Sequence, residues 1–225
     1  MAAGAIAASL LKSLGITVCA YTKAVGPYEA DPAQFDPEEM YRNRLYMPDA
    51  KAARKAEAYL EEMMARKDSC GGVVECVIHG MPVGVGEPVF DKLDAVLAQA
   101  LMSVGAVKGV EIGDGFAAAR SRGSFNNDAY RPAGAGSTPG NPATNHCGGI
   151  LGGISTGQPL VMTVAIKPIP SIAKEQQSVN AEGSPVSLRV GGRHDICAIP
   201  RVNPVLEAMA ALTVADALLL QRRMG

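Results

Sequence analysis

The stretch from Asn145 to Gly157, NHCGGILGGISTG, constrains the fold of this chain more than any other segment. It places five glycines around short apolar pairs and leads straight into a strand-like run, PLVMTVAIKP. Glycine adopts a positive φ without strain and lets another molecule approach bare backbone N–H groups. The tract therefore favours a ligand surface, but a plain tight turn across a packed helix has the same composition. Residue types alone do not separate these two interpretations.

Two further segments place a cation beside exposed backbone. Lys167 to Ser171, KPIPS, ends the run after the tract, and Gly191 to Asp195, GGRHD, opens the loop before the last predicted helix. Arg193 can hold a carboxylate or phosphate through two hydrogen bonds, and Asp195 can accept or relay a proton. The alternatives are a local ion pair between Arg193 and Asp195, and an ordinary surface charge at Lys167.

Composition and charge argue against several classes of protein. A chain of 225 residues with 48% hydrophobic residues is long enough for one sizeable core or two small ones, as in soluble globular proteins. A formal net charge of -1 offers no basic excess for a nucleic acid. The apolar N-terminal stretch is short and has no basic leader, so we expect neither a signal peptide nor a membrane span. We therefore expect a cytoplasmic protein.

Cysteines and histidines do not form a metal pattern. The five cysteines are odd in number and never spaced as CxxC, which favours reduced thiols over a disulfide framework or a zinc site. The three histidines share no ligand spacing and no HExxH occurs, so no metal is expected. We interpret His79 as structural, whereas His146 and His194 stand beside glycines and are candidates for a functional role.

Hydrophobic periodicity predicts a soluble α+β protein. We expect a single domain over residues 1–225. Apolar residues recur at helical spacing over 2–14, 50–67, about 90–101 and 203–223, and strand-like runs cover 16–21, 73–79, 106–112 and 159–168. Asp49 is the predicted N-cap of the second helix. Residues 122–144 contain almost nothing apolar, so we predict a mobile loop there, either a lid or a plain disordered excursion.

Four segments together resemble one known family. They are the run from Gly86 to Phe116, GEPVFDKLDAVLAQALMSVGAVKGVEIGDGF, the tract NHCGGILGGISTGQP, the segment KPIPSI and the turn GRHD. In this order and at these spacings they resemble chorismate synthase, and the likeness runs from Met1 to the final helix. The sequence lacks the RSSARET and GESHG motifs of that family, and it has Ile196 where the family has proline.

The resemblance implies a β-α-β sandwich with antiparallel sheets flanking central helices. It implies a lyase of the shikimate pathway, which serves aromatic amino acid biosynthesis. That enzyme converts 5-enolpyruvylshikimate 3-phosphate to chorismate and phosphate by 1,4-anti elimination, with reduced FMN as cofactor and NADPH as a candidate reductant of the flavin. It also implies a homotetramer or dimer.

The resemblance further implies the roles of individual residues. Arg193 and Asp195 are the implied catalytic residues, with Asp195 helping to deprotonate through the flavin N5. Because the proton-handling histidines of the family fall in the missing portion, we expect little elimination by this chain alone. The alternative is a non-catalytic FMN- or phosphate-binding fragment that needs a separate N-terminal half. The implied flavin contacts are Gly105, Ala106, Gly152, Lys167, Pro168, Ile169, Pro170, Ser171 and Arg193.

Overall fold

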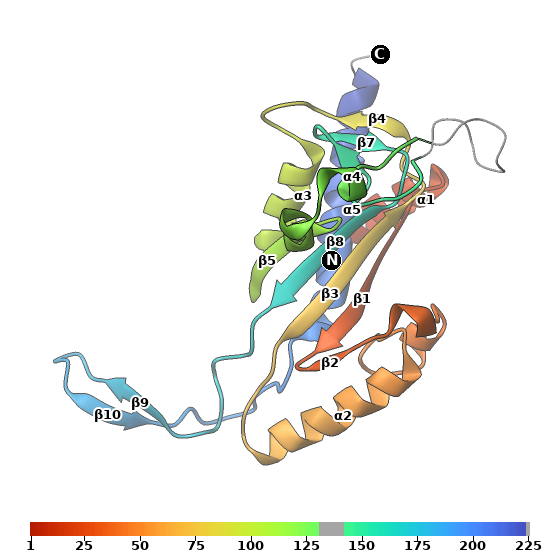
Figure 1. Cartoon of the computed structure of the whole chain (residues 1–225). Helices are drawn as coiled ribbons and strands as arrows, with labels where there is room; N and C mark the ends of the chain where they lie inside the picture. The colour runs from red at the N-terminus through yellow and green to blue at the C-terminus, as the bar shows by residue number, and fades with distance from the viewer. Residues whose placement is uncertain (131–141, 224–225) are drawn as a thin grey trace. The chain divides into compact units, whose positions relative to one another are not determined.

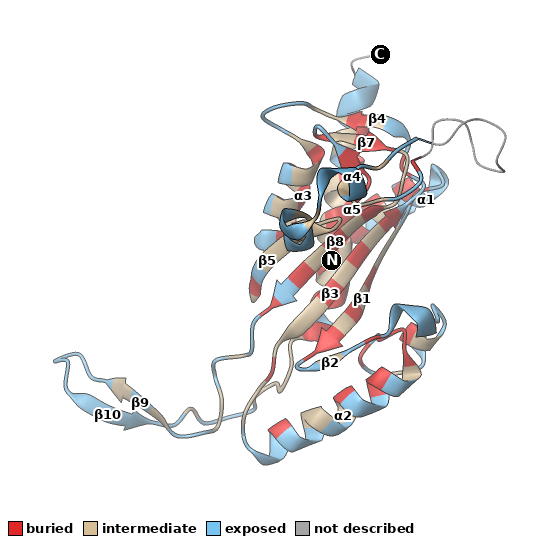
Figure 2. Ribbon diagram, in the orientation of Figure 1, coloured by how far each residue is buried: buried red, intermediate tan, exposed pale blue. Residues whose placement is uncertain are grey.

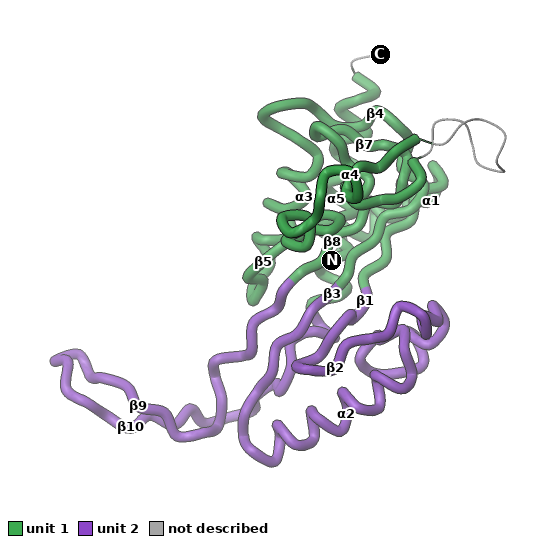
Figure 3. Tube along the Cα trace, in the orientation of Figure 1, with its two compact units in different colours: residues 1–20, 75–164, 202–225 green, residues 21–74, 165–201 purple. Residues whose placement is uncertain are grey.

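A computed structural model describes residues 1–130 and 142–223 of the chain. The residues group into two compact units, shown in Figure 3. Unit 1 contains residues 1–20, 75–164 and 202–225, and unit 2 contains residues 21–74 and 165–201. Three strands, β1 (Thr17–Val25), β3 (Gly72–His79) and β8 (Leu160–Ile166), and one helix, α5 (Ile199–Arg223), run from one unit into the other. Because elements are shared between the units, this grouping does not test whether the chain forms one domain. The single domain over residues 1–225 stays a prediction.

Helices and strands are mixed along the chain, and five consecutive strands, β6 to β10, precede the last helix (Figure 1). The helices are α1 (Ala2–Ser13), α2 (Ala50–Ala65), α3 (Leu93–Met102), α4 (Gly123–Asn126) and α5 (Ile199–Arg223), with 3-10 turns at Pro32–Gln34, Glu39–Tyr41 and Gly115–Arg120. The strands are β1 (Thr17–Val25), β2 (Tyr28–Glu29), β3 (Gly72–His79), β4 (Val83–Gly86), β5 (Val107–Ile112), β6 (Ile150–Leu151), β7 (Ile154–Thr156), β8 (Leu160–Ile166), β9 (Gln176–Val179) and β10 (Pro185–Leu188).

The strands form three sheets. The largest has the order β2-β1-β3-β8-β5, a smaller one has the order β4-β7-β6, and β9 pairs with β10. The pairs β1–β2, β4–β7, β6–β7 and β9–β10 are antiparallel. The chain therefore has the predicted α+β fold.

In unit 1, α5 packs against the large sheet. Its residues Leu206, Ala210 and Val214 are buried, and the Glu207 carboxylate accepts a hydrogen bond from the backbone N–H of Ala20. Burial raises the pKa of Glu207 above its ordinary value, in spite of this hydrogen bond. Among the described helices α5 is long and apolar enough to cross a membrane by length and composition, but its inner face is packed as in a core helix.

In unit 2, α2 begins where the sequence predicts. The Asp49 side chain accepts hydrogen bonds from the N–H groups of Lys51 and Ala52, so it caps the helix. The buried residues of α2 follow one side of the helix in Figure 2. Met64 lies within the apolar run predicted over 50–67 but is 62% exposed. Its neighbour Met63 takes the buried position because the helix face turns by about 100° per residue.

Several boundaries differ from the predictions. Helix α5 begins at Ile199 instead of Asn203, because a proline such as Pro200 is tolerated in the first helical turn, where N–H groups have no intrahelical acceptor. Helix α3 begins at Leu93, so Phe90, at the start of the predicted run over about 90–101, lies outside the helix and is 90% exposed. The short strands β4, β6 and β7 and the β9–β10 hairpin were not predicted.

The predicted mobile loop over 122–144 falls partly on residues 131–141, which lie outside the described part of the chain. Its described flanks contain α4 and a single bridge between Tyr130 and Pro142. The mobility of the loop stays a prediction.

Candidate functional site

The glycine tract forms a β-hairpin in unit 1. Strands β6 and β7 pair in antiparallel register, with Leu151 opposite Ile154, and Gly152 and Gly153 make the two-residue turn. Both turn residues have a positive φ, 62° and 89°, as the favoured two-residue hairpin turn requires. The hairpin then pairs through β7 with β4. The tract is thus an ordered β-element rather than an irregular loop.

Other glycines of the tract allow close backbone packing. A Cβ atom on Gly148 would lie 2.3 Å from the nitrogen of Gly113, and a Cβ on Gly149 would lie 2.5 Å from the carbonyl oxygen of Pro159. Both glycines also have a positive φ, 66° and 79°. The plain structural interpretation of the tract therefore accounts for Gly148 and Gly149.

The predicted flavin positions in unit 1 differ from these packed glycines. Neither Gly105 nor Gly152 has any heavy atom within 4 Å of a built Cβ among the described residues, so the space beside both is open. Ala106, next to Gly105, has a φ of 75°, which an L-residue rarely adopts. Such strain is held by surrounding structure and is concentrated at functional sites. These features fit a surface left free for a ligand.

Asp128 anchors the start of the tract from the described flank of the 122–144 segment. Its carboxylate accepts hydrogen bonds from the N–H of His146 and of Cys147, both at 2.8 Å, and from the Thr144 hydroxyl at 2.6 Å. Burial alone would raise the pKa of Asp128, but these hydrogen bonds outweigh it and hold the pKa at about 2. The sequence offered no signal for this contact, because Asp128 precedes its partners by 16 to 19 positions.

We expect Asp128→Ala to lower the free energy of unfolding at pH 7 by about 1–2 kcal/mol, a value reduced from the full pKa shift because solvent screens a half-buried group. The native pKa lies below the unfolded value of 3.8, so the carboxylate stabilises the fold above that value. This stabilisation is lost as the pH falls from about 4 to about 2. Urea unfolding of the unaltered chain and of Asp128→Ala, between pH 7 and pH 3, measures the difference in their free energies of unfolding. An equal difference at all pH values would contradict the assignment.

Two of the three histidines have clear partners. His146 Nδ1 lies 2.7 Å from an Asp114 carboxylate oxygen, and its ring packs against Phe125 with centroids 5.0 Å apart. His194 Nε2 lies 3.1 Å from the carbonyl oxygen of Val190 in unit 2. His146 is thus an oriented imidazole beside a carboxylate, whereas the His194 contact is local to its own loop.

The predicted cationic residues both lie in unit 2. Lys167 and Arg193 are exposed, and neither forms an ion pair within residues 1–130 and 142–223. The local ion pair that we considered between Arg193 and Asp195 is not formed. Asp195 instead pairs with Arg201 Nη1 at 2.8 Å. Both cations are therefore available to an anion.

A turn that we did not single out contacts the Lys167–Ser171 segment. The Ser69 hydroxyl donates a hydrogen bond to the carbonyl oxygen of Ile169 at 2.6 Å. A Cβ on Gly71 would lie 2.3 Å from the carbonyl oxygen of Ile166, so the two backbones are in direct contact. The segments are about a hundred positions apart, and no local pattern could have predicted this support.

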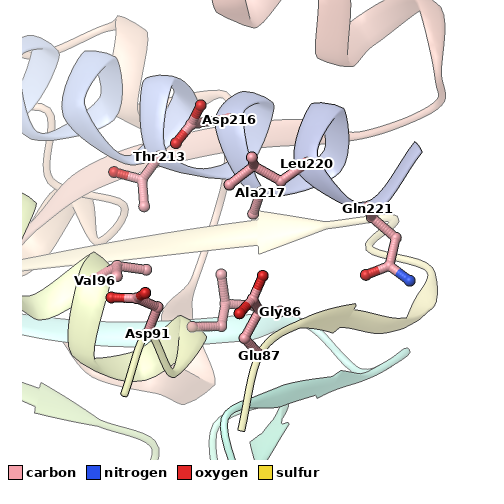
Figure 4. Close-up of a pocket in the computed structure, with 10 residues that line it drawn as sticks. Gly86, Glu87, Asp91, Val96, Thr213, Asp216, Ala217, Leu220 and Gln221 are labelled. Atoms are coloured by element: carbon pink, nitrogen blue, oxygen red, sulfur yellow. The ribbon is translucent and has the colours of Figure 1, made fainter. Parts of the chain in front are cut away.

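A cavity of about 270 Å³ in unit 1 does not have the chemistry of the predicted site (Figure 4). Its polar lining includes the carboxylates of Glu87, Asp91 and Asp216, over apolar atoms of Leu93 and Leu220. Carboxylates repel a phosphorylated ligand. None of the predicted site residues lines this cavity, nor the cavity of about 460 Å³ beside the hairpin in the described part of unit 1.

Three comparisons with known proteins lead to the same family. A family model described as chorismate synthase matches residues 1–219. The chain is 53% identical over 221 residues to a chorismate synthase of Agathobacter rectalis, covering 98% of this chain and 59% of that relative. It is 54% identical over 225 residues to one of Nitratidesulfovibrio vulgaris, covering 100% of this chain and 61% of that relative. A solved structure, "Crystal Structure of Chorismate Synthase", matches with a TM-score of 0.78 at 31% identity, covering 98% and 62% of the two chains.

Matches of this length define an α+β protein of a known enzyme family. The chain belongs to the chorismate synthase family. It spans about three fifths of the length of the curated relatives it matches, 59% and 61% for the two named above.

Proposed function

We propose that this chain carries the flavin-binding part of a lyase that converts 5-enolpyruvylshikimate 3-phosphate to chorismate and phosphate. The reaction is a 1,4-anti elimination in the shikimate pathway of aromatic amino acid biosynthesis. The observation that carries the proposal is the family match over residues 1–219. We further propose a cytoplasmic protein that assembles as a homotetramer or dimer.

The residues present fit a phosphorylated flavin. Gly105 and Gly152 leave backbone uncovered, and Ala106 is held in an unusual conformation. Lys167 and Arg193 carry positive charge that is not neutralised by an ion pair in the described residues. Anionic oxygens bind strongly to such donors, and guanidinium binds them through two parallel hydrogen bonds. We assign the contacts with reduced FMN to these residues and to Pro168, Ile169, Pro170 and Ser171.

The charges of these residues suit an elimination that releases phosphate. Reduced FMN, when bound, supplies an electron transiently without net oxidation, and NADPH is a candidate source for its reduction. Lys167 and Arg193 would stabilise negative charge that develops on the leaving phosphate. The Asp195 carboxylate, oriented by Arg201 at 2.8 Å, is the proposed proton acceptor.

An anaerobic titration tests this function. The purified chain is mixed with reduced FMN and then with 5-enolpyruvylshikimate 3-phosphate, and flavin absorbance and released phosphate are recorded. We expect saturable flavin binding but little phosphate release, because the proton-handling histidines of the family fall outside the matched residues. Absence of flavin binding would contradict the proposal, and rapid turnover by this chain alone would contradict the assignment of proton transfer to the absent residues.

A second candidate function follows from the length of the match, 59% of the Agathobacter rectalis relative. The chain would be a non-catalytic FMN- or phosphate-binding fragment that needs a separate N-terminal half. Adding the unmatched part of that relative as a second polypeptide discriminates between them. Phosphate release that appears only with the second polypeptide supports the fragment that needs a separate half, and release by this chain alone supports catalysis by the chain itself.

A further inference from the structure

Two thiols from distant parts of the sequence lie in contact within unit 2. Cys70 stands in the turn before β3, and Cys197 follows the GRHD segment. The backbone N–H of Cys70 donates to the carbonyl oxygen of Ile196 at 3.0 Å, so the two cysteines stand on adjoining backbones. The Cys70 thiol donates a hydrogen bond to the sulfur of Cys197. The two sulfur atoms are therefore neighbours in the reduced protein.

The two cysteines differ in exposure and in pKa. As whole residues, Cys70 is only 5% exposed, whereas Cys197 is half-buried. The hydrogen bond from Cys70 lowers the pKa of Cys197 against the opposing effect of burial, and the N–H of Ile199 lowers it further. The same thiol pair and burial raise the pKa of Cys70. Cys197 is accordingly the nucleophilic sulfur, since the thiolate is the reactive form.

We propose that Cys197 and Cys70 form a redox-sensitive pair that small-molecule disulfides, such as oxidised glutathione, convert to an internal disulfide. The Cys197 thiolate attacks one sulfur of the glutathione disulfide, breaks its S–S bond and releases one glutathione. Cys70 then loses its proton and attacks the sulfur of Cys197, which releases the second glutathione. Two protein thiols are oxidised and one small disulfide is reduced, with two electrons and two protons transferred.

The backbones that carry the two cysteines adjoin, as a disulfide requires. The sulfurs must close from hydrogen-bond contact to about 2.05 Å. The other three cysteines show no thiol–thiol hydrogen bond in the described residues. The pair thus combines proximity with one half-buried member.

The disulfide would covalently link the turn that carries Cys70 to the loop that carries Arg193. The turn that carries Cys70 contacts the Lys167–Ser171 segment through Ser69 and Gly71, and Cys197 ends the loop that carries Arg193. Oxidation would therefore limit the motion of both segments. The consequence for the cofactor rests on the proposed function, but formation of the disulfide does not.

The experiment uses glutathione buffers of increasing oxidised fraction. The reduced chain is equilibrated in each buffer, remaining thiols are blocked with an alkylating reagent, and the intact mass and the disulfide-linked peptides are determined. We expect loss of the mass of two hydrogens and a peptide that joins Cys70 to Cys197. Hydrogen exchange should slow over residues 193–196 in the oxidised protein.

Three variants sharpen the result. Cys70→Ser should stop at the mixed disulfide and gain the mass of one glutathione less two hydrogens, and Cys70→Ala repeats the test if the serine variant does not fold. Cys147→Ser, which removes a half-buried thiol in unit 1, should form the same disulfide as the unaltered chain. A wild-type chain that stays reduced or retains a persistent mixed disulfide in the most oxidising buffer would overturn the proposal. These outcomes are independent of flavin binding, so they also distinguish this proposal from the proposed function.

Discussion

Replacing Gly148 with alanine is expected to lower the free energy of unfolding by more than about 3 kcal/mol. Gly148 has a φ of 66°, where an L-residue is strained by about 1–2 kcal/mol. Its new Cβ would also lie 2.3 Å from the nitrogen and 2.6 Å from the Cα of Gly113. These are backbone atoms of a neighbouring turn and cannot swing away as a flexible side chain can. Equilibrium unfolding in urea measures the loss.

Gly152 provides a matched control for this prediction. It has nearly the same φ, 62°, but no heavy atom within 4 Å of a built Cβ among the described residues. Gly152→Ala should therefore cost only the backbone strain, about 1–2 kcal/mol. Equal destabilisation by the two substitutions would show that close packing against Gly113 contributes nothing to stability.

The second large effect is expected on flavin affinity. Lys167→Ala and Arg193→Ala should each weaken the binding of reduced FMN by about 10- to 100-fold. A hydrogen bond to a charged group contributes about 1.5–3 kcal/mol, and each 1.4 kcal/mol changes affinity tenfold. Anaerobic titration followed by flavin absorbance gives the dissociation constants. Unchanged constants in both variants would refute the role of these cations.

Two further variants separate geometry from general charge. Arg193→Lys keeps the positive charge but loses the paired hydrogen bonds, so its affinity should fall between those of the wild type and Arg193→Ala. Lys174→Ala removes a cation from the same unit that pairs with Asp68 at 3.1 Å. Such an exposed ion pair contributes little, and flavin affinity should be unchanged. Weakening by Lys174→Ala as large as that by Lys167→Ala would indicate a diffuse electrostatic effect.

The long elements of the fold could be predicted because their patterns are local. The N-cap at Asp49 needs only a polar side chain before a periodic apolar run, and α2 begins there. The two-residue strands β2 and β6 are defined by pairing with neighbouring strands. Two residues are too few to show an alternating hydrophobic pattern, so the sequence does not predict them. The predicted start at Asn203 missed the first turn of α5, in which Pro200 is tolerated, and Pro204 lies inside the observed helix.

The site was predictable as residue types but not as contacts. Lys167 and Arg193 could be chosen because each cation adjoins proline or glycine, and the structure leaves both exposed. The residues that contact Asp195 and His146 could not be predicted from the sequence. Arg201 reaches Asp195 from the start of α5, and Asp114 reaches His146 from a turn 32 positions earlier. Such pairings depend on tertiary packing, which short-range patterns do not encode.

The passage of β1 and β3 from one unit into the other has a practical consequence for fragment studies. Each unit is assembled from separated stretches of the polypeptide, so no contiguous gene fragment encodes either one. A deletion designed to isolate residues 21–74 would cut β1 after Ala20 and β3 after Val74. Recombinant dissection of this protein is therefore better served by point substitutions than by excised pieces.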